Sequence, residues 1–303
     1  MSRLYLIDTL YHVFRAFHAL PASLTAPDGR PTNAVHGVLG IFSNLWRTEQ
    51  VEYAVAVFES LTATFREELD PEYKANREPP DPNLKRQIPL VERACHCLGI
   101  PTLAVDGYEA DDVMGALAHR AVAAGHAVTI VSNDKDLAQI LALGGDIELL
   151  RLSGTGKSAK VERIRPEGVV ELFGVPPELI PSWLALKGDT VDNIKGVPGI
   201  GQKTASRLLL EHGGLVNLLA EPTRAGRYAE KLVALKDRLV RDLEVATIKT
   251  DLDLGFDGLD LERFRPIPLQ GAVEFFEDLG MHRHLSAVEQ LIFPEPTVAE
   301  LWG

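Results

Sequence analysis

Short apolar runs alternate with longer amphipathic stretches along the first half of the chain, and several of the runs end in an acidic residue. The runs have the length of buried strands, and the stretches repeat their apolar positions with helical spacing. We predict strands at 3–7, 54–58, 127–131 and 147–150, and helices at about 33–48, 80–98 and 109–124. This alternation predicts an α/β domain with a mainly parallel sheet and helices on both of its faces.

The pattern changes after about residue 165, where helical spacing continues and strand-like runs become few. The helices predicted there are 166–173, 177–187, 201–211, 214–220 and 228–247, followed by one or two more within 268–290. We therefore expect three parts, which span residues 1–170, 171–265 and 266–303.

Acidic side chains stand where the predicted strands end and in two later segments. The set comprises Asp8, Glu59, Glu109, Asp111, Asp112, Asp134, Asp136, Asp189 and Asp192. Sites in parallel sheets form beyond the carboxyl ends of the strands, so these acids should converge. Asp134 and Asp136 point the same way if their segment is extended. Asp189 and Asp192 share a face if theirs is helical.

Each acid taken singly has an ordinary explanation, as a helix cap, a partner of the helix dipole or a solvated loop residue. Together the acids would repel one another, and few Lys or Arg residues lie in these segments to balance them. Hard divalent cations with oxygen ligands supply such a balance. Two ions about 4 Å apart can activate water and stabilise the leaving oxygen in phosphodiester hydrolysis. We therefore predict a metal site for that reaction.

A glycine-rich turn, GVPGIGQKTA at 196–205, joins two predicted helices. Gly196, Gly199 and Gly201 permit a tight turn and a close approach of the backbone to a ligand. The N–H groups at the start of the next helix suit a phosphate, and Lys203 adds a positive charge. A plain helix–helix turn is the alternative, but it needs fewer glycines. We predict that this turn contacts a phosphate backbone.

The segment SGTGKS at 153–158 ends like a nucleotide-binding P-loop, but Arg151 stands where that pattern requires glycine. The sequence that follows, KVERIR, is strand-like rather than helical. We expect a hairpin here and no ATP site.

Residues 64–93 are rich in proline and in basic side chains. Beside an acidic metal site, such a segment can gather a phosphate chain and stack a base on an aromatic ring. A solvated surface is the alternative interpretation. The residues expected to contact DNA here are Arg66, Tyr73, Lys74 and Arg77.

The net charge of −12 argues at first against nucleic acid, since affinity for DNA comes largely from Lys and Arg. Acids concentrated in a metal site can give this balance beside local basic surfaces, so the charge does not exclude DNA. No apolar stretch is long enough for a membrane span, and the N-terminal run lacks the features of a signal peptide. Only Cys95 and Cys97 are present, which is poor material for a disulfide framework, so we expect the reducing cytoplasm. We expect a monomer because nothing in the sequence suggests a larger assembly.

Five motifs follow one another along the chain: LIDTLYHVFRAFHAL, FREELDPEYKANR, GYEADDV, SNDKDLAQIL and LKGDTVDNIKGVPGIGQKTA. Together they resemble the 5′ nuclease domain of bacterial DNA polymerase I and, more broadly, the flap endonuclease family, from about residue 3 to residue 250. The resemblance implies that 1–170 form a PIN-like catalytic domain with an arch or clamp near 65–95. It also implies a helix–three-turn–helix DNA-binding domain within 171–265, followed by a helical segment.

The resemblance also implies roles for individual residues. Asp8, Glu109, Asp111 and Asp134 would form the more catalytic metal site, and the remaining carboxylates would complete the cluster, partly through water. Two Mg²⁺ or Mn²⁺ ions are implied, and a monovalent cation such as K⁺ at carbonyls of the glycine turn. Lys74 would stabilise charge on the scissile phosphate, and Arg77 and Arg15 would contact phosphates.

Two departures from the family pattern bear on activity. Glu59 stands where relatives usually have Asp, and Thr9 follows Asp8 where a small residue is usual. The longer Glu59 side chain can shift an ion or alter the preferred metal. The expected activity is metal-dependent 5′-3′ exonuclease and 5′ flap cleavage of DNA, extending to RNA primers. A catalytically weak flap-binding protein and a PIN-type ribonuclease are the alternatives.

Overall fold

The computed structural model describes residues 2–60, 62–153, 160–267 and 272–281, together with residues 290 and 292. The P-loop-like turn and most of the C-terminal segment that was expected to be helical lie outside the described residues.

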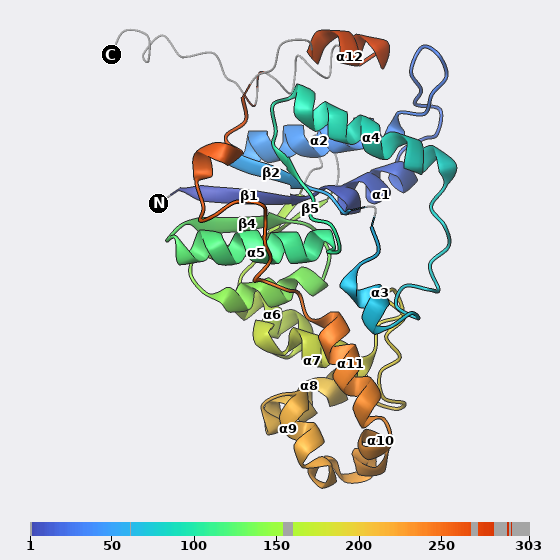
Figure 1. Cartoon of the computed structure of the whole chain (residues 1–303), viewed down its shortest axis with the longest axis vertical. Helices are drawn as coiled ribbons and strands as arrows, with labels where there is room; N and C mark the ends of the chain where they lie inside the picture. Colours follow the sequence, from blue (N-terminus) through green and yellow to red (C-terminus); the bar gives the residue numbers. More distant parts are fainter. Residues whose placement is uncertain are drawn as a thin grey trace.

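A six-stranded sheet in the order β3-β2-β1-β4-β5-β6 forms the first part of the fold (Figure 1). Its strands are β1 (Arg3–Asp8), β2 (Tyr53–Val57), β3 (Thr102–Leu103), β4 (Ala127–Val131), β5 (Ile147–Ser153) and β6 (Lys160–Ile164). All neighbouring pairs are parallel except β5 and β6, which form the expected antiparallel hairpin. The chain places β2 and β4 on opposite sides of β1, so the switch point of the sheet lies at the end of β1, beside Asp8.

Helices cover both faces of the sheet, as predicted (Figure 1). They are α1 (Thr9–Ala19), α2 (Asn33–Thr48), α4 (Pro82–Cys97), α5 (Ala110–Ala123) and the 3-10 helix η1 (Asp136–Leu143). The short helix α3 (Phe65–Leu69) instead contacts α11 (Lys236–Ala246) of the helical part. Tyr5 and Ile7 of β1 pack in the cluster formed with α1, α2 and α4, whereas Leu4 and Leu6 pack in the cluster formed with α5 and η1. Because both faces are buried, β1 is continuously apolar instead of alternating.

The second part of the chain is helical. Its elements are α6 (Pro166–Phe173), η3 (Pro177–Leu179), α7 (Ile180–Lys187), α8 (Gln202–His212), α9 (Leu215–Ala220), η4 (Pro222–Tyr228), α10 (Ala229–Ala234), α11 (Lys236–Ala246), η5 (Leu261–Phe264) and α12 (Ala272–Asp278). The chain after α11 returns to α5 at Gly115. A Cβ there would lie only 2.6 Å from the Ile248 side chain and 2.9 Å from the Lys249 carbonyl. This close approach packs the chain that follows α11 against α5, which covers one face of the sheet.

The single helix predicted over 228–247 is wrong. The structure has two helices, α10 and α11, with Leu235 between them at φ −108° and ψ 9°. The break lets α10 pack on η4 while α11 packs against α7. Periodicity alone did not indicate it, since apolar positions recur on both sides of Leu235.

No single helix among the described residues is long and apolar enough to cross a membrane. By length and composition alone, α6 and the following segment Pro177–Lys187 pass together, but they are bent by 50°. Most side chains of α7 are buried within the fold, as expected for a core helix.

Candidate active site

Asp8 lies at the centre of the carboxyl edge of the sheet, where β1 ends and α1 begins. Its buried carboxylate accepts hydrogen bonds from the Ser132 hydroxyl (2.7 Å) and from the N–H of Tyr11 (3.2 Å). Burial raises the pKa of Asp8 to about 7, although the Ser132 hydrogen bond lowers it; the charge of Asp134 raises it further. Asp8 and Asp134 therefore repel each other across the ends of β1 and β4.

Asp111 and Asp134 complete this central group. Asp111 lies in the first turn of α5, and burial, followed by the charges of Asp134 and Asp8, raises its pKa well above the usual range. The N–H of Asp134 donates to the Ser132 hydroxyl (3.0 Å), and the N–H of Asp136 donates to Asp134 Oδ1 (2.9 Å). The structure thus brings three carboxylates from three elements to one edge of the sheet.

This central group suits a divalent cation in its chemistry. In the described part of the chain, no three His, Cys, Asp or Glu side chains are already arranged to hold a metal ion. However, Asp8, Asp111 and Asp134 make no ion pair with a Lys or Arg among the described residues. A cation placed between them would relieve the repulsion that raises the pKa values of Asp8 and Asp111. Carboxylate oxygens are also the ligands that Mg²⁺ prefers.

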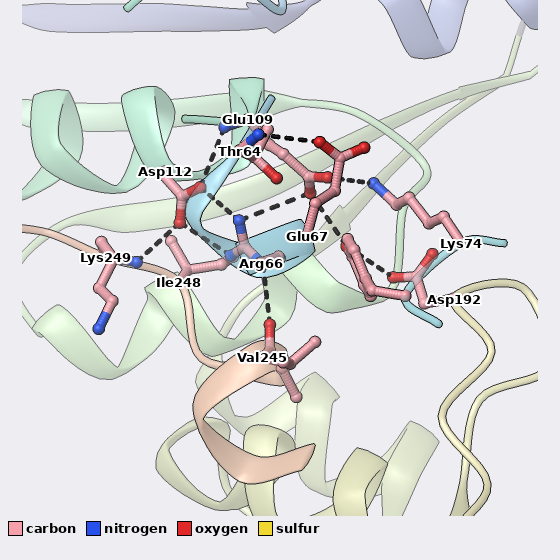
Figure 2. A network of polar contacts seen from close by, with 12 residues as sticks. Thr64, Arg66, Glu67, Lys74, Glu109, Asp112, Asp192, Val245, Ile248 and Lys249 are labelled. Atoms are coloured by element: carbon pink, nitrogen blue, oxygen red, sulfur yellow. Dashed lines mark hydrogen bonds and ion pairs between the residues drawn. The ribbon is translucent and has the colours of Figure 1, made fainter. Parts of the chain in front are cut away.

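Glu109 joins the basic segment to the acidic cluster (Figure 2). Lys74 Nζ lies 2.6 Å from Glu109 Oε1, and the Tyr73 hydroxyl donates to Oε2 (3.1 Å). Burial opposes ionisation, but Lys74 and Arg66 hold the pKa of Glu109 below its usual range. Lys74 has a left-handed backbone (φ 55°), and its N–H donates to the Asp192 carbonyl (3.2 Å). This geometry holds the lysine ammonium at the edge of the acidic cluster.

The acids of the helical part reach the same edge through a tight turn. Hydrogen bonds between the backbones of Asp189 and Ile194, both 2.7 Å, close this turn. Asp189 and Asp192 therefore lie in a turn and not on a helix face, which was the condition for their predicted i, i+3 pairing. Arg77 donates to Asp192 Oδ1 (2.6 Å). The basic segment is thereby attached to the helical part.

Lys135 connects this turn to the end of β4. Its Nζ lies 2.5 Å from Asp189 Oδ2 and 3.3 Å from Asp136 Oδ1. Burial and the charge of Asp134 raise the pKa of Asp136 to about 7 in spite of Lys135. Asp189 is also buried, but the hydrogen bond from Lys135 holds its pKa below the usual range. Two of the predicted metal ligands thus share one lysine.

The placements of Asp112 and Arg66 contradict the roles predicted for them (Figure 2). Arg66 is 3% exposed and Asp112 is fully buried. Their side chains form a bidentate ion pair, in which Arg66 Nη1 donates to Asp112 Oδ2 (2.5 Å) and Nη2 donates to Oδ1 (2.8 Å). Asp112 also accepts from the N–H groups of Glu109 (3.1 Å) and Lys249 (2.9 Å). Asp112 is therefore not open to a metal ion, and DNA cannot reach Arg66.

Tyr73 is buried as well, at 7% exposure, so it does not offer its ring for stacking with a base. Its hydroxyl instead lies between two carboxylates, 3.1 Å from Glu109 Oε2 and 3.4 Å from Asp192 Oδ2. An aromatic residue in a basic segment indicated a surface for bases, but here the ring packs inside and only the hydroxyl takes part in the site.

The other predicted residues lie at or near the surface. Arg77 and Lys203 are exposed, and Glu59 is exposed just after β2. The charge of Glu59 still contributes to the raised pKa of Asp8, which places it near the central group. Arg15 is partly buried and donates to the carbonyl of Leu152. The roles predicted for these residues stay predictions.

The glycine turn combines positive φ with close backbone contacts. Gly196 (φ 63°) admits no side chain, because a Cβ would lie 2.5 Å from the backbones of Gly188 and Lys187. Gly199 also has positive φ (88°), whereas Gly201 is extended and has open space. The N–H groups of Gly199 and Gly201 make no hydrogen bond within the described part of the chain. Two donors are thus free for an anion, as a phosphate site requires.

Three carbonyls of the same turn are already bonded. The Gly196 carbonyl accepts from Arg238, that of Pro198 from Lys231 (2.8 Å) and that of Gly199 from the Tyr228 hydroxyl (3.3 Å). Two of these oxygens therefore face a cationic side chain, Arg238 or Lys231, whose charge opposes the binding of a monovalent cation beside them.

Sequence reasoning missed two residues that organise the site. Ser132 holds both Asp8 and the backbone of Asp134, and Lys135 bridges Asp136 and Asp189. Both lie in SNDKD, directly after a predicted strand. The signal available in the sequence was that both residues stand between or beside the acidic residues of this segment.

Comparison with known proteins agrees with this geometry. Residues 3–174 match the profile described as 5′-3′ exonuclease, N-terminal resolvase-like domain, and residues 175–267 match 5′-3′ exonuclease, C-terminal SAM fold. The chain belongs to the 5′-3′ exonuclease family. It is therefore a nuclease, and the two matched regions meet directly after α6, the first helix of the helical part.

Relatives of this exonuclease-family chain occur alone and within longer proteins. It is 36% identical to the 5′-3′ exonuclease of Aquifex aeolicus over 292 residues, which are 96% of each chain. It is 42% identical to DNA polymerase I of Pseudomonas aeruginosa over 260 residues. That alignment takes in 83% of this chain but only 28% of the polymerase.

Solved structures of the same fold include the T5 D15 protein and the catalytic core of Rad2. The T5 D15 protein co-crystallised with metal ions matches with a TM-score of 0.65 at 19% identity, over 96% of this chain and 98% of that one. The catalytic core of Rad2 in complex with DNA substrate matches with a TM-score of 0.61 at 15% identity, over 96% and 93%. At these identities the likeness establishes the fold.

Proposed function

We propose that the chain hydrolyses phosphodiesters of DNA at 5′ ends and 5′ flaps, with two divalent ions such as Mg²⁺ or Mn²⁺. The observation that carries the proposal is the group Asp8, Asp111 and Asp134. These carboxylates share the switch point of the sheet, and the mutual repulsion that contributes to the raised pKa values of Asp8 and Asp111 calls for positive charge. With Glu109 they would hold the first ion. The second would be held by Asp136, Asp189 and Asp192, with Glu59 at the rim.

The ions, when bound, supply an activated water and stabilise the leaving oxygen. The chain itself positions the phosphate. Lys74 lies at the edge of the cluster, 2.6 Å from Glu109, and its ammonium can stabilise charge that develops on the scissile phosphate. Arg77 is exposed beside it and can hold a neighbouring phosphate. Recognition would rest on the backbone and shape of the DNA, with little reading of bases.

The glycine turn would hold the duplex beyond the cleavage site. Its free N–H groups at Gly199 and Gly201 point to a phosphate contact, which the exposed Lys203 extends. A K⁺ ion at the carbonyls of this turn would lie close to the charges of Arg238 and Lys231. We include K⁺ as a further part of the proposal.

We further propose that the substrates include RNA primers at the 5′ end of a DNA strand and that the protein acts as a monomer. We place it in the reducing cytoplasm, which two free cysteines support, one of them buried and one partly buried.

Product lengths from an end-labelled 5′-flap duplex test the proposal. The reactions contain Mg²⁺, Mn²⁺ or chelator, and use the wild type, Asp134→Ala and, as a matched control, Asp257→Ala, which alters an exposed acid distant from the site in sequence. We expect metal-dependent cuts near the junction that only Asp134→Ala abolishes. Flap binding without cutting in any metal would instead support the weak binding protein. Preference for single-stranded RNA would support the ribonuclease.

A further inference from the structure

The ammonium of Lys135 lies inside the acidic cluster, although Lys135 has no part in the proposed reaction. It stands between Asp134 and Asp136 in the segment that follows β4. Its Nζ lies 2.5 Å from Asp189 Oδ2 and 3.3 Å from Asp136 Oδ1. One cation of the chain thus contacts two of the three aspartates that are proposed to hold the second ion.

The two oxygens that face Lys135 are suited to a cation. Both atoms are buried, and apart from the contact with Lys135 neither has a hydrogen-bond partner within the described part of the chain. The other oxygen of Asp189 differs, because it accepts from the N–H of Val191 (2.9 Å) inside its own turn. A buried carboxylate oxygen without such a donor requires positive charge nearby. The sheet part and the helical part therefore each direct one such oxygen to the same position, where Lys135 supplies the charge.

The ammonium can leave this position more easily than the carboxylates can. The Lys135 side chain is 33% exposed, and a lysine carries its charge on a flexible four-carbon stem. The Asp189 side chain is only 5% exposed, and the hydrogen bonds between Asp189 and Ile194 hold its backbone in the turn. Rotation of the lysine stem would therefore expose two fixed carboxylates that have lost their cation.

A divalent ion and the ammonium cannot share these oxygens. Two cations on the same pair of oxygens would lie within about 4 Å of each other, where charges interact strongly even at an effective dielectric constant of about 20. Oxygens of this kind are also the ligands that Mg²⁺ and Mn²⁺ take. No such competitor exists at Asp8, Asp111 and Asp134, which make no ion pair with a Lys or Arg in the part of the chain that the structure describes.

We infer that Lys135 occupies the position of the second divalent ion in the metal-free protein and has to leave it before that ion binds. The inference rests on the proposed function, because it concerns how the same cluster is loaded with metal. The lysine makes binding of the second ion competitive. Occupancy of the second position therefore depends on metal concentration in a range where the central position is already filled.

Mn²⁺ binding measures this competition without cleavage. Electron paramagnetic resonance of free Mn²⁺ gives the Kd of the first and of the second ion for the wild type, Lys135→Met and Lys135→Arg. Methionine keeps most of the apolar stem and removes the charge, whereas arginine keeps the charge. Lys236→Met, at an exposed lysine of α11, is the matched control.

We expect the wild type to bind its second Mn²⁺ more weakly than its first, and Lys135→Met to bind the second ion about tenfold more tightly than the wild type does. Lys135→Arg and Lys236→Met should keep the wild-type ratio of the two constants. A lysine that only holds the two parts of the fold together predicts the reverse for Lys135→Met, because its loss would separate the carboxylates and weaken the second ion.

The wild type provides a second readout that needs no folded variant. Mass spectrometry after brief acylation with a succinimidyl ester compares the reactivity of Lys135 in chelator and in saturating Mn²⁺, with Lys236 as the internal reference. Mn²⁺ should raise the reactivity of Lys135 and leave that of Lys236 unchanged. A second ion that binds folded Lys135→Met no more tightly, or a Lys135 reactivity that Mn²⁺ does not raise, would overturn the inference alone. A wild type that binds no Mn²⁺ would overturn the proposed function with it.

Discussion

The buried ion pair between Arg66 and Asp112 links α3, at the start of the basic segment, to α5, and its contribution to stability can be measured. Arg66→Met removes the cation and leaves Asp112 fully buried, with only the N–H groups of Glu109 and Lys249 as partners. It also leaves the carbonyl of Val245 without the Arg66 donor (2.8 Å). The change therefore leaves an unpaired charge inside the protein and weakens the contacts of α3 with α5 and with the end of α11.

Breaking a buried ion pair by removing one partner costs about 3–5 kcal/mol, because the remaining charge stays desolvated. For a chain of this size, that corresponds to a fall in Tm of about 6–20 °C. In Arg66→Met/Asp112→Leu neither charge of this pair remains, and Glu109 keeps Lys74 as its cationic partner. The remaining cost comes mainly from lost hydrogen bonds, at about 1–3 kcal/mol. The coupling free energy between the two sites should then be at least about 3 kcal/mol.

Equilibrium unfolding in urea measures these values for the two single variants and the double variant. Arg77→Met is the matched control, since Arg77 is 47% exposed in its ion pair with Asp192 and should cost less than about 1 kcal/mol. If Arg66→Met and Asp112→Leu each cost no more than this control, or if their effects simply add, the reasoning from burial is refuted.

Three further predictions address catalysis, pH and the glycine turn. Lys74→Ala should slow single-turnover flap cleavage by about 10²–10³-fold with binding in chelator retained, and a loss below tenfold would contradict its role. Burial holds Asp8 and Asp136 at a pKa of about 7, above their unfolded values, so Tm of the metal-free protein should fall from about pH 5 to 7. The buried His12, with a pKa lowered to about 4, offsets only part of this fall; a rising Tm would disprove the assignment. Gly196→Ala should cost more than about 1 kcal/mol and weaken DNA binding, whereas Gly201→Ala should do neither.

Much of the α/β part could be predicted because its signals are local. The helix predicted over 33–48 is Asn33–Thr48, and the strand predicted over 127–131 is Ala127–Val131. The break at Leu235 could not be predicted in this way. It depends on which surfaces α10 and α11 cover, and those surfaces come from residues far away in the sequence.

The convergence of acids was predictable for the same reason that sites form in parallel sheets: strand ends meet at one edge. The sequence did not indicate which of the charged side chains would be buried. The partners of Arg66 include Val245 and Thr247, nearly 180 residues later. The sequence did contain one indication that the Asp112 carboxylate would be used within the fold, since Asp112 stands three residues after Glu109 at the start of a helix. In that position its carboxylate can turn back to the Glu109 N–H, and it does.

The distribution of charge within the acidic cluster indicates at which carboxylates a bound metal ion would relieve the most repulsion. Glu109 and Asp189 are buried, but lysines of this chain pair with them and keep their pKa values low. Asp8 and Asp111 lack such partners among the described residues, and their pKa values are raised. A chain with a net charge of −12 therefore neutralises the rim of its acidic cluster with its own cations and leaves the centre uncompensated. A divalent ion should consequently bind first at the centre, between the ends of β1 and β4 and the start of α5.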